Sequence, residues 1–316
     1  MKRTAILVTV VGALAASFGA SATPVFAQQG KVQIVYEEPK NPKFQPIYES
    51  LRQRKVLETL QNFLSPLKLE RTLTIKTAEC GGSPFAPYQK GGLATLCYEY
   101  VDLIESVLPG EKGKGISAPK DYRRLFKNLG RIGPVLVTRN MAAEGPFVEQ
   151  ALHETALGVF DVLDVPIWGR RDDAADYLAA YLMVQFGSDV ARKTVYGTAY
   201  FLNQLDLLNR SNVMDTDYLS AVHPTIRQRY YNVLCIALGN DPIEFSTFIP
   251  DKMKVSDVSL PYGRLASCTG QLETARHETG TDYGKVGAAF AELILPHVDL
   301  DLLKKVQNTK WLPEDE

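Results

Sequence analysis

The segment from residue 147 to residue 163 combines a helical pattern of apolar residues with a histidine and a glutamate. At about 100° per residue, one face of such a helix collects Val148, Leu152, Ala156, Val159 and Leu163. His153 lies at the edge of this apolar stripe, and Leu157 lies farther round, on the polar side. A helix with this pattern buries its stripe in a core, so His153 is expected at the border of that core and Glu154 on the polar side, beside Leu157.

Residues 153–157 read H-E-T-A-L, which matches only part of the zinc peptidase motif H-E-x-x-H. In the full motif two imidazoles one helical turn apart bind Zn²⁺, and the glutamate between them polarises the metal-bound water. Leu157 stands where the second histidine would be. On their own, His153 and Glu154 fit better as a hydrogen-bonded structural histidine and an exposed glutamate.

A second helix is predicted from residue 172 to residue 186, with an apolar stripe of its own. Asp172 extends its buried side, Asp176 lies at the border and Asp173 points away. An acidic side chain that faces inward needs a partner. Asp172 either caps the helix or interacts with its positive end, or it binds a metal ion together with His153. The sequence favours neither alternative over the other.

A third element of interest is His223, which precedes Pro224 at the start of a helix predicted from residue 225 to residue 238. It either polarises a substrate carbonyl or stabilises an oxyanion across a cleft, or it is a loop residue without a role. His277 and His297 have no acidic or histidine neighbours at ligand spacing, so they are left out of the site.

The first residues have the pattern of an export signal, with Lys2 and Arg3, a short apolar run and small residues up to Ala27. No later segment reaches the ~20 consecutive apolar residues that a membrane-spanning helix needs. We therefore expect residues 1–27 to be a signal peptide, and residues 28–316 to form a single domain that is periplasmic or secreted.

Charge and composition limit the partners of the mature chain. The signal segment contains two basic residues and no acidic one, so its removal changes 35 basic and 36 acidic residues to 33 and 36. A nearly neutral chain without a basic cluster is not typical of nucleic-acid binding. Nothing in the sequence indicates a nucleotide, a flavin or a haem, and the expected partner is a peptide or a protein.

Four cysteines in an exported chain indicate disulfides, and four cysteines allow three pairings. Cys80 and Cys97 flank a loop rich in glycine and proline, while Cys235 and Cys268 lie on later segments. We expect the pairs Cys80–Cys97 and Cys235–Cys268. Free buried thiols are the less favoured alternative in an oxidising compartment.

The remaining pattern predicts an α+β domain that is mainly helical. Strands are expected at residues 31–37, 71–77 and 93–98, with a turn at residues 80–84. Further helices are expected at residues 47–64, 122–128, 199–208 and 263–276, and two short helices broken at Pro296 within residues 285–306. A solvated or mobile loop is expected at residues 110–119. The strands at 71–77 and 93–98 would form a small sheet packed over the helix that carries His153.

Short blocks of sequence also follow one another over nearly the whole mature chain. They are E-C-G (79–81), L-C-Y-E (96–99), L-H-E (152–154), D-V-P-I-W-G-R (164–170), D-D-A-A-D (172–176), Q-R-Y-Y-N-V-L-C (228–235), G-N-D-P (239–242) and R-L-A-S-C (264–268). In this order and spacing the chain resembles a family of exported bacterial proteins of unknown function that are classed as metallopeptidases of the zincin type.

The resemblance implies a zincin-like domain with zinc as the cofactor. In it His153 corresponds to a zinc ligand and Glu154 to the general base. Asp172 stands in the place of a family glutamate that supplies the third ligand, and Asp176 corresponds to an acid that orients a ligand. His223 corresponds to a histidine that precedes the block Q-R-F-Y-N in the family.

The chain departs from the family pattern at residues of the proposed site and not in the blocks that form the scaffold. The family motifs read H-E-x-G-H and R-E-E-D-A-A-D, whereas Leu157 replaces the second histidine, Ala156 the glycine, and Arg171 and Asp172 two glutamates. Two functions follow. The first is peptide hydrolysis by a water that Glu154 activates at an altered metal site, with His153 and Asp172 as ligands and His223 as a further candidate ligand. The second is binding of a peptide or partner protein in the same cleft without catalysis. The residues alone favour the second, and a purely structural role is a third alternative.

Overall fold

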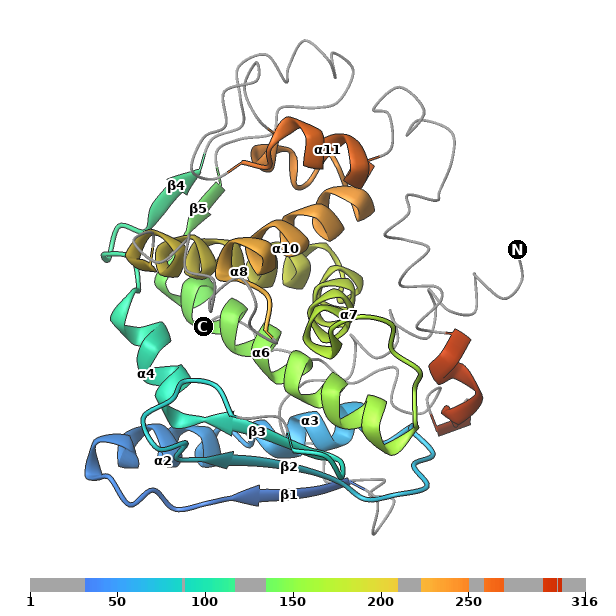
Figure 1. Ribbon diagram of the computed structural model, residues 1–316. Coiled ribbons are helices and arrows are strands. Elements are labelled where there is room, and N and C mark those ends of the chain that lie inside the picture. Colours follow the sequence, from blue (N-terminus) through green and yellow to red (C-terminus); the bar gives the residue numbers. More distant parts are fainter. Residues whose placement is uncertain are drawn as a thin grey trace.

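The computed structural model describes residues 32–86, 89–116, 135–209, 223–249, 259–269, 292–299 and 301–302. Within these ranges a long helix, α6 (Arg139–Val162), lies between a small sheet and a group of further helices (Figure 1). The predicted signal peptide, the predicted helix at residues 122–128 and His277 fall outside the described residues.

The sheet is parallel and has the strand order β1-β2-β3. Its strands are β1 (Val32–Tyr36), β2 (Leu73–Ala78) and β3 (Leu93–Cys97). Ile75 of β2 pairs with Ile34 on one side and Ala94 on the other, and Ile75 and Ala94 are fully buried. Strands β2 and β3 contact α6, which confirms the predicted sheet over the histidine-bearing helix.

Where one helix was predicted at residues 47–64, the chain between β1 and β2 forms two. A short 3-10 helix, η1 (Pro42–Phe44), precedes α2 (Gln45–Gln53) and α3 (Val56–Leu64). Lys55 separates the two α-helices because its φ of 53° lies in the left-handed region, which does not continue a right-handed helix. The break lets the apolar side chains of both helices reach the core.

The other helices are α4 (Tyr98–Ser106), α7 (Arg171–Gln185), α8 (Ser188–Asn209), α10 (Ile226–Asn240), α11 (Tyr262–Thr269) and the 3-10 helices η3 (Ser246–Phe248) and η4 (Leu295–His297). Of these, α7 and α10 lie within two residues of their predicted bounds, whereas α8 begins 11 residues before its predicted start at residue 199. The predicted loop at residues 110–119 is wrong in part, since β4 (Lys114–Ile116) pairs there with β5 (Val135–Val137). The pairing gives the backbone groups of this segment partners that the sequence pattern did not reveal.

Helix α6 is buried on every side along its second half. Its side chains from Val148 to Val162 are all buried, including the polar ones. Figure 1 shows why: the sheet lies below this helix, and α7, α8 and α10 cover it from above. A helix that is enclosed in this way must find partners inside the protein for its polar residues.

The enclosure depends on two glycines where α6 and α8 touch. A Cβ placed on Gly145 would lie 2.5 Å from the carbonyl oxygen of Thr194, and one placed on Gly197 would collide with the carbonyl oxygen of Met141. Both obstacles are backbone atoms, which cannot move away as a flexible side chain can. The two helices therefore pack backbone against backbone.

Both predicted disulfides are confirmed. Cys80 pairs with Cys97 at a Cα–Cα distance of 5.6 Å, and Cys235 pairs with Cys268 at 5.0 Å. The first bond joins the loop after β2 to the end of β3, and the second joins α10 to α11. Among the described residues, no helix has the length and apolar character required to cross a membrane.

We expect Gly197→Ala to lower the free energy of unfolding by about 3 kcal/mol, because the added methyl group forces α6 and α8 apart. Gly263→Ala is the matched control, since Gly263 is an exposed helical glycine whose added Cβ meets nothing within 4 Å. Its greater helix propensity should raise stability by up to about 1 kcal/mol. Urea unfolding followed by circular dichroism measures both, and equal effects would contradict the packing described.

Candidate functional site

His153 lies on α6 between two carboxylates of α7. Its Nδ1 is 2.7 Å from Oδ1 of Asp176, and its Nε2 is 3.6 Å from Oδ1 of Asp172. Because the carboxylate of Asp176 can only accept, Nδ1 carries the proton of that hydrogen bond. The ring is therefore fixed in orientation, with Nε2 directed towards Asp172.

The two aspartates face His153 because they lie one turn apart on the same side of α7. Asp172 and Asp176 are 3% and 1% exposed, whereas Asp173 pairs with Arg170 at 2.8 Å. The predicted directions are thus confirmed: Asp172 faces inward, Asp176 lies at the border of the buried side and Asp173 points away. Arg170 is the N-cap residue of α7 and makes no side-chain capping bond, so contact with histidine, not helix capping, is the role that the structure gives Asp172.

His223 completes this group from the segment before α10. Its Nδ1 donates to Oδ1 of Asp172 over 2.7 Å, while 56% of its side chain is exposed. The helix that follows begins with a capping box, in which Thr225 and Gln228 bond each other's backbone N–H groups. The cap fixes where α10 starts and so holds His223 close to α7.

A buried arginine on α10 neutralises the acids on the far side of His153. Arg229 donates from Nη2 to Glu149 of α6 over 2.8 Å and from Nε to Asp176 over 3.1 Å. The side chains of Glu149 and Asp176 are each 1% exposed. The guanidinium thus links α6, α7 and α10 through charge-assisted hydrogen bonds.

Glu154 occupies the same pocket and is 7% exposed. Gln150, one turn earlier on α6, donates from Nε2 to its Oε1 over 2.7 Å. The prediction of an exposed glutamate is therefore wrong, because α6 is enclosed on its polar side as well. Glu154 is a buried carboxylate that accepts a hydrogen bond from its own helix.

Burial and the neighbouring charges separate the pKa values of these groups. Burial alone would lower the pKa of His153, but Asp176 and Asp172 outweigh it and raise that pKa to about 10. Burial raises the pKa of Glu154 to about 7. Burial opposes ionisation of Asp172, yet His153 and His223 hold its pKa well below the usual range. The hydrogen bond to Asp172 raises the pKa of His223.

These residues line one pocket with a volume of about 110 Å³. Its polar lining consists of Gln150, His153, Glu154, Asp172, His223 and Arg229, and its apolar lining of Phe85, Ala86, Leu157, Pro224 and Ile226. Leu157 is 3% exposed and packs in a core cluster with Ala156, Phe160 and Leu178. The position of the missing histidine thus belongs to the apolar wall.

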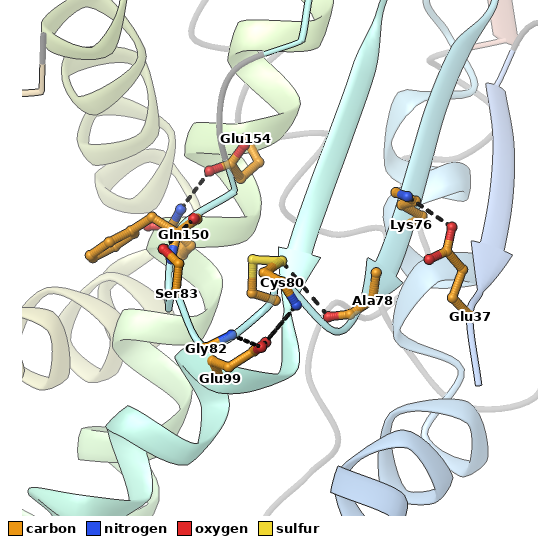
Figure 2. The surroundings of a disulfide bond; sticks show 11 residues. Glu37, Lys76, Ala78, Cys80, Gly82, Ser83, Glu99, Gln150 and Glu154 are labelled. Carbon is orange, nitrogen blue, oxygen red and sulfur yellow. Dashed lines mark hydrogen bonds and ion pairs between the residues drawn. A yellow bond between two sulfur atoms is a disulfide. The ribbon is translucent and has the colours of Figure 1, made fainter. Parts of the chain in front are cut away.

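The rim that carries Phe85 and Ala86 is the loop after β2. Glu99 accepts hydrogen bonds from the backbone N–H groups of Cys80 and Gly82, each over 2.9 Å, and the disulfide to Cys97 ties the same loop to β3. Figure 2 shows this anchored loop beside Gln150 and Glu154 of α6. The Phe85 ring lies 5.9 Å from the guanidinium of Arg229. The rim is therefore held in place beside the pocket.

Around His153, two sets of described residues have ligand atoms close enough to hold a cation. Ligand atoms of Glu149, His153 and Asp176 lie within 4.8 Å of one another, but the guanidinium of Arg229 already bonds both carboxylates. The second set is Nε2 of His153 with Oδ1 of Asp172, 3.6 Å apart. Tetrahedral zinc ligands with bonds of about 2.0–2.1 Å lie about 3.3 Å from one another, so this pair fits a metal ion.

The structure brings together every residue that the sequence placed in the site: His153, Glu154, Asp172, Asp176 and His223. His297 lies in η4 and does not line the pocket. Sequence reasoning missed the partners that surround this group, which are Glu149, Gln150, Arg229 and the rim residue Phe85. Glu149 and Gln150 stand one turn before His153 and Glu154, and that spacing was the available signal.

Comparisons with known proteins agree with this arrangement. Residues 36–278 match a family that is described as "Putative metallopeptidase". The match includes α6, α7, α10 and the rim loop, and therefore all residues of the pocket. No curated protein and no solved structure matched the chain.

We expect Arg229→Met to destabilise the protein by about 3–5 kcal/mol, because it leaves Glu149 and Asp176 buried without their cation. Arg192→Met is the matched control, since Arg192 pairs with Glu244 over 2.8 Å with 41% of its side chain exposed. That substitution should cost less than about 1 kcal/mol. Urea unfolding compares the two, and similar losses would show that the buried pairs contribute no more than a surface pair.

The raised pKa of His153 predicts a dependence of stability on pH. A histidine whose pKa rises on folding stabilises the protein fully below its unfolded pKa of about 6.5, and this contribution is lost as pH increases through about 10. Between about pH 7 and about pH 9, the wild type should therefore lose stability relative to His153→Gln. The free energy of unfolding of the two proteins, measured as a function of pH in the presence of EDTA, tests this difference. Parallel curves for the two proteins would disprove it.

Proposed function

The chain belongs to the family of metallopeptidase-like proteins that its residues 36–278 match, and on this premise we propose that it is an exported, metal-dependent peptide hydrolase. One observation carries the proposal. The imidazoles of His153 and His223 both approach Oδ1 of Asp172 in a pocket that also contains Glu154. Imidazole, carboxylate and a neighbouring glutamate are the groups from which zinc hydrolases are built.

His153 and Asp172 would hold the metal ion. Asp176 orients His153 by accepting its Nδ1 proton, which leaves Nε2 as the metal-binding nitrogen. Nε2 faces Oδ1 of Asp172 over 3.6 Å, and these two atoms would hold a divalent cation between them once Nε2 has released its proton. When bound, the metal ion supplies Lewis-acid chemistry and lowers the pKa of water.

Glu154 would act as the general base. Its carboxylate lies in the pocket beside the metal-binding pair, and burial brings its pKa to about 7. A base with a pKa near the working pH accepts a proton readily and returns it to the leaving group. Gln150 holds one carboxylate oxygen of Glu154, so the other is available to the attacking water.

His223 would contribute to catalysis from the opposite edge of the pocket. It is the most exposed member of the group and bonds Asp172 directly. The apolar wall beside it, formed by Phe85, Leu157 and Ile226, would receive an apolar side chain of a peptide. The two disulfides support a site of action in the periplasm or outside the cell.

A second function, peptide binding without catalysis, is favoured by one observation. Leu157 fills the position of the second histidine and packs into an apolar cluster. Catalytic zinc has three protein ligands and an open position, and the two helices supply only His153 and Asp172. In this alternative the same pocket binds a peptide, and the family's chemistry is lost.

Metal content and hydrolysis together test the proposal. We expect the purified protein to bind one zinc ion, and to cleave a mixture of unstructured peptides in a reaction that a chelator stops and zinc restores. Glu154→Gln should lower kcat by about 10²–10⁴-fold and leave zinc affinity unchanged, because Glu154 is not a ligand. Peptide cleavage followed by mass spectrometry and zinc titration measure the two effects.

Asp173→Asn is the control, since Asp173 is on the same helix as Asp172 but pairs with Arg170. The variant Leu157→His separates the two functions. Tight zinc binding in that variant alone, with none in the wild type, would establish the non-catalytic alternative and refute the hydrolase.

A further inference from the structure

We infer that His223 is the third protein ligand of the metal ion in this chain, in place of the imidazole that is missing at Leu157. The inference rests on the proposed metal site and adds a residue that lies 70 positions from His153 in the sequence, the difference between 223 and 153. It changes the ligand set from two histidines of one helix to one histidine of α6, one aspartate of α7 and one histidine before α10.

The geometry around Asp172 carries this inference. Its Oδ1 lies 3.6 Å from Nε2 of His153 and 2.7 Å from Nδ1 of His223. Ligand atoms of a tetrahedral zinc ion are about 3.3 Å apart, so the first distance changes little on binding. The distance from Oδ1 of Asp172 to Nδ1 of His223 would increase by about 0.6 Å, the difference between 3.3 and 2.7 Å. The half-exposed ring of His223 can make this shift without repacking the core.

The other polar residues of the pocket are already engaged. Glu149 and Asp176 are bonded by Arg229, and Asp176 also holds His153. Glu154 is bonded by Gln150 and is required as the base. Among the described residues of the pocket, His223 is therefore the donor that can join His153 and Asp172.

The charge of the site favours a cation at this point. Four buried carboxylates, those of Glu149, Glu154, Asp172 and Asp176, surround one permanent cation, the guanidinium of Arg229. The site thus holds more acidic groups than cationic ones, and a divalent cation held by His153, Asp172 and His223 would offset that imbalance.

Two imidazoles and one carboxylate form a donor set that suits Zn²⁺ and other first-row divalent metals. The test therefore uses Zn²⁺ for affinity and Co²⁺ for its visible absorption, which reports the number and type of ligands. We expect His223→Ala to bind Zn²⁺ more than about 100-fold more weakly than the wild type, since loss of an outer contact alone costs about 10–100-fold. Its Co²⁺ spectrum should lose the intensity of a four-coordinate site.

The double variant Leu157→His/His223→Ala provides the rescue. It restores an imidazole one turn after His153 on α6, so Zn²⁺ affinity should return towards that of the wild type. His297→Ala is the histidine control outside the pocket and should leave binding unchanged. Thermal unfolding of each variant in EDTA verifies that the fold is retained.

The outcomes separate this inference from the proposed function. If His153→Ala abolishes Zn²⁺ binding and His223→Ala stays within about threefold of the wild type (far below the loss expected from a ligand), the metal site stands and His223 is not a ligand. If the double variant remains as weak as His223→Ala, His223 acts on the shape of the pocket and the inference also fails. If the wild type binds neither ion, the proposed function itself is wrong.

Discussion

The contact of Arg229 with Glu149 and Asp176 is the interaction on which the rest of the site depends. A buried carboxylate without a partner costs several kcal/mol, and α6 and α7 each place one beside His153. A single guanidinium bonds both, at 2.8 Å and 3.1 Å. Asp176 accepts the Nδ1 proton of His153, which directs Nε2 into the pocket. Without Arg229, the two buried carboxylates would lose the cation that holds them in place, and the orientation of the imidazole would be lost with it.

This polar network is possible because close packing of the neighbouring elements encloses α6. Gly145 and Gly197 let α8 approach α6 at backbone distance, and Gly158 lets β2 approach from the opposite side, where an added Cβ would lie 2.5 Å from Leu73. Close approach excludes water, and exclusion of water strengthens each electrostatic interaction inside. The same enclosure raises the pKa of Glu154 to about 7. The packing that encloses α6 therefore also determines the pKa of a side chain on that helix.

The sequence predicted the inward direction of Asp172 and the border position of Asp176, because helical periodicity fixes which residues share a face. It also predicted the two disulfides and the small sheet. It did not predict Arg229 as the partner of Glu149, since 80 residues separate them and no local pattern encodes a contact between distant helices. The break at Lys55 was missed for a related reason. The apolar spacing continues through it, and only the backbone reveals the left-handed residue.

The replacement at residue 157 changes two properties of the pocket at once. It removes an imidazole from α6, and it extends the apolar cluster of Ala156, Phe160 and Leu178 to the pocket wall. Hydrocarbon offers a cation no ligand atoms, so a cation in this pocket would be held on the side of Asp172, where His223 stands. The leucine that removes a ligand at residue 157 thus favours His223 as the ligand.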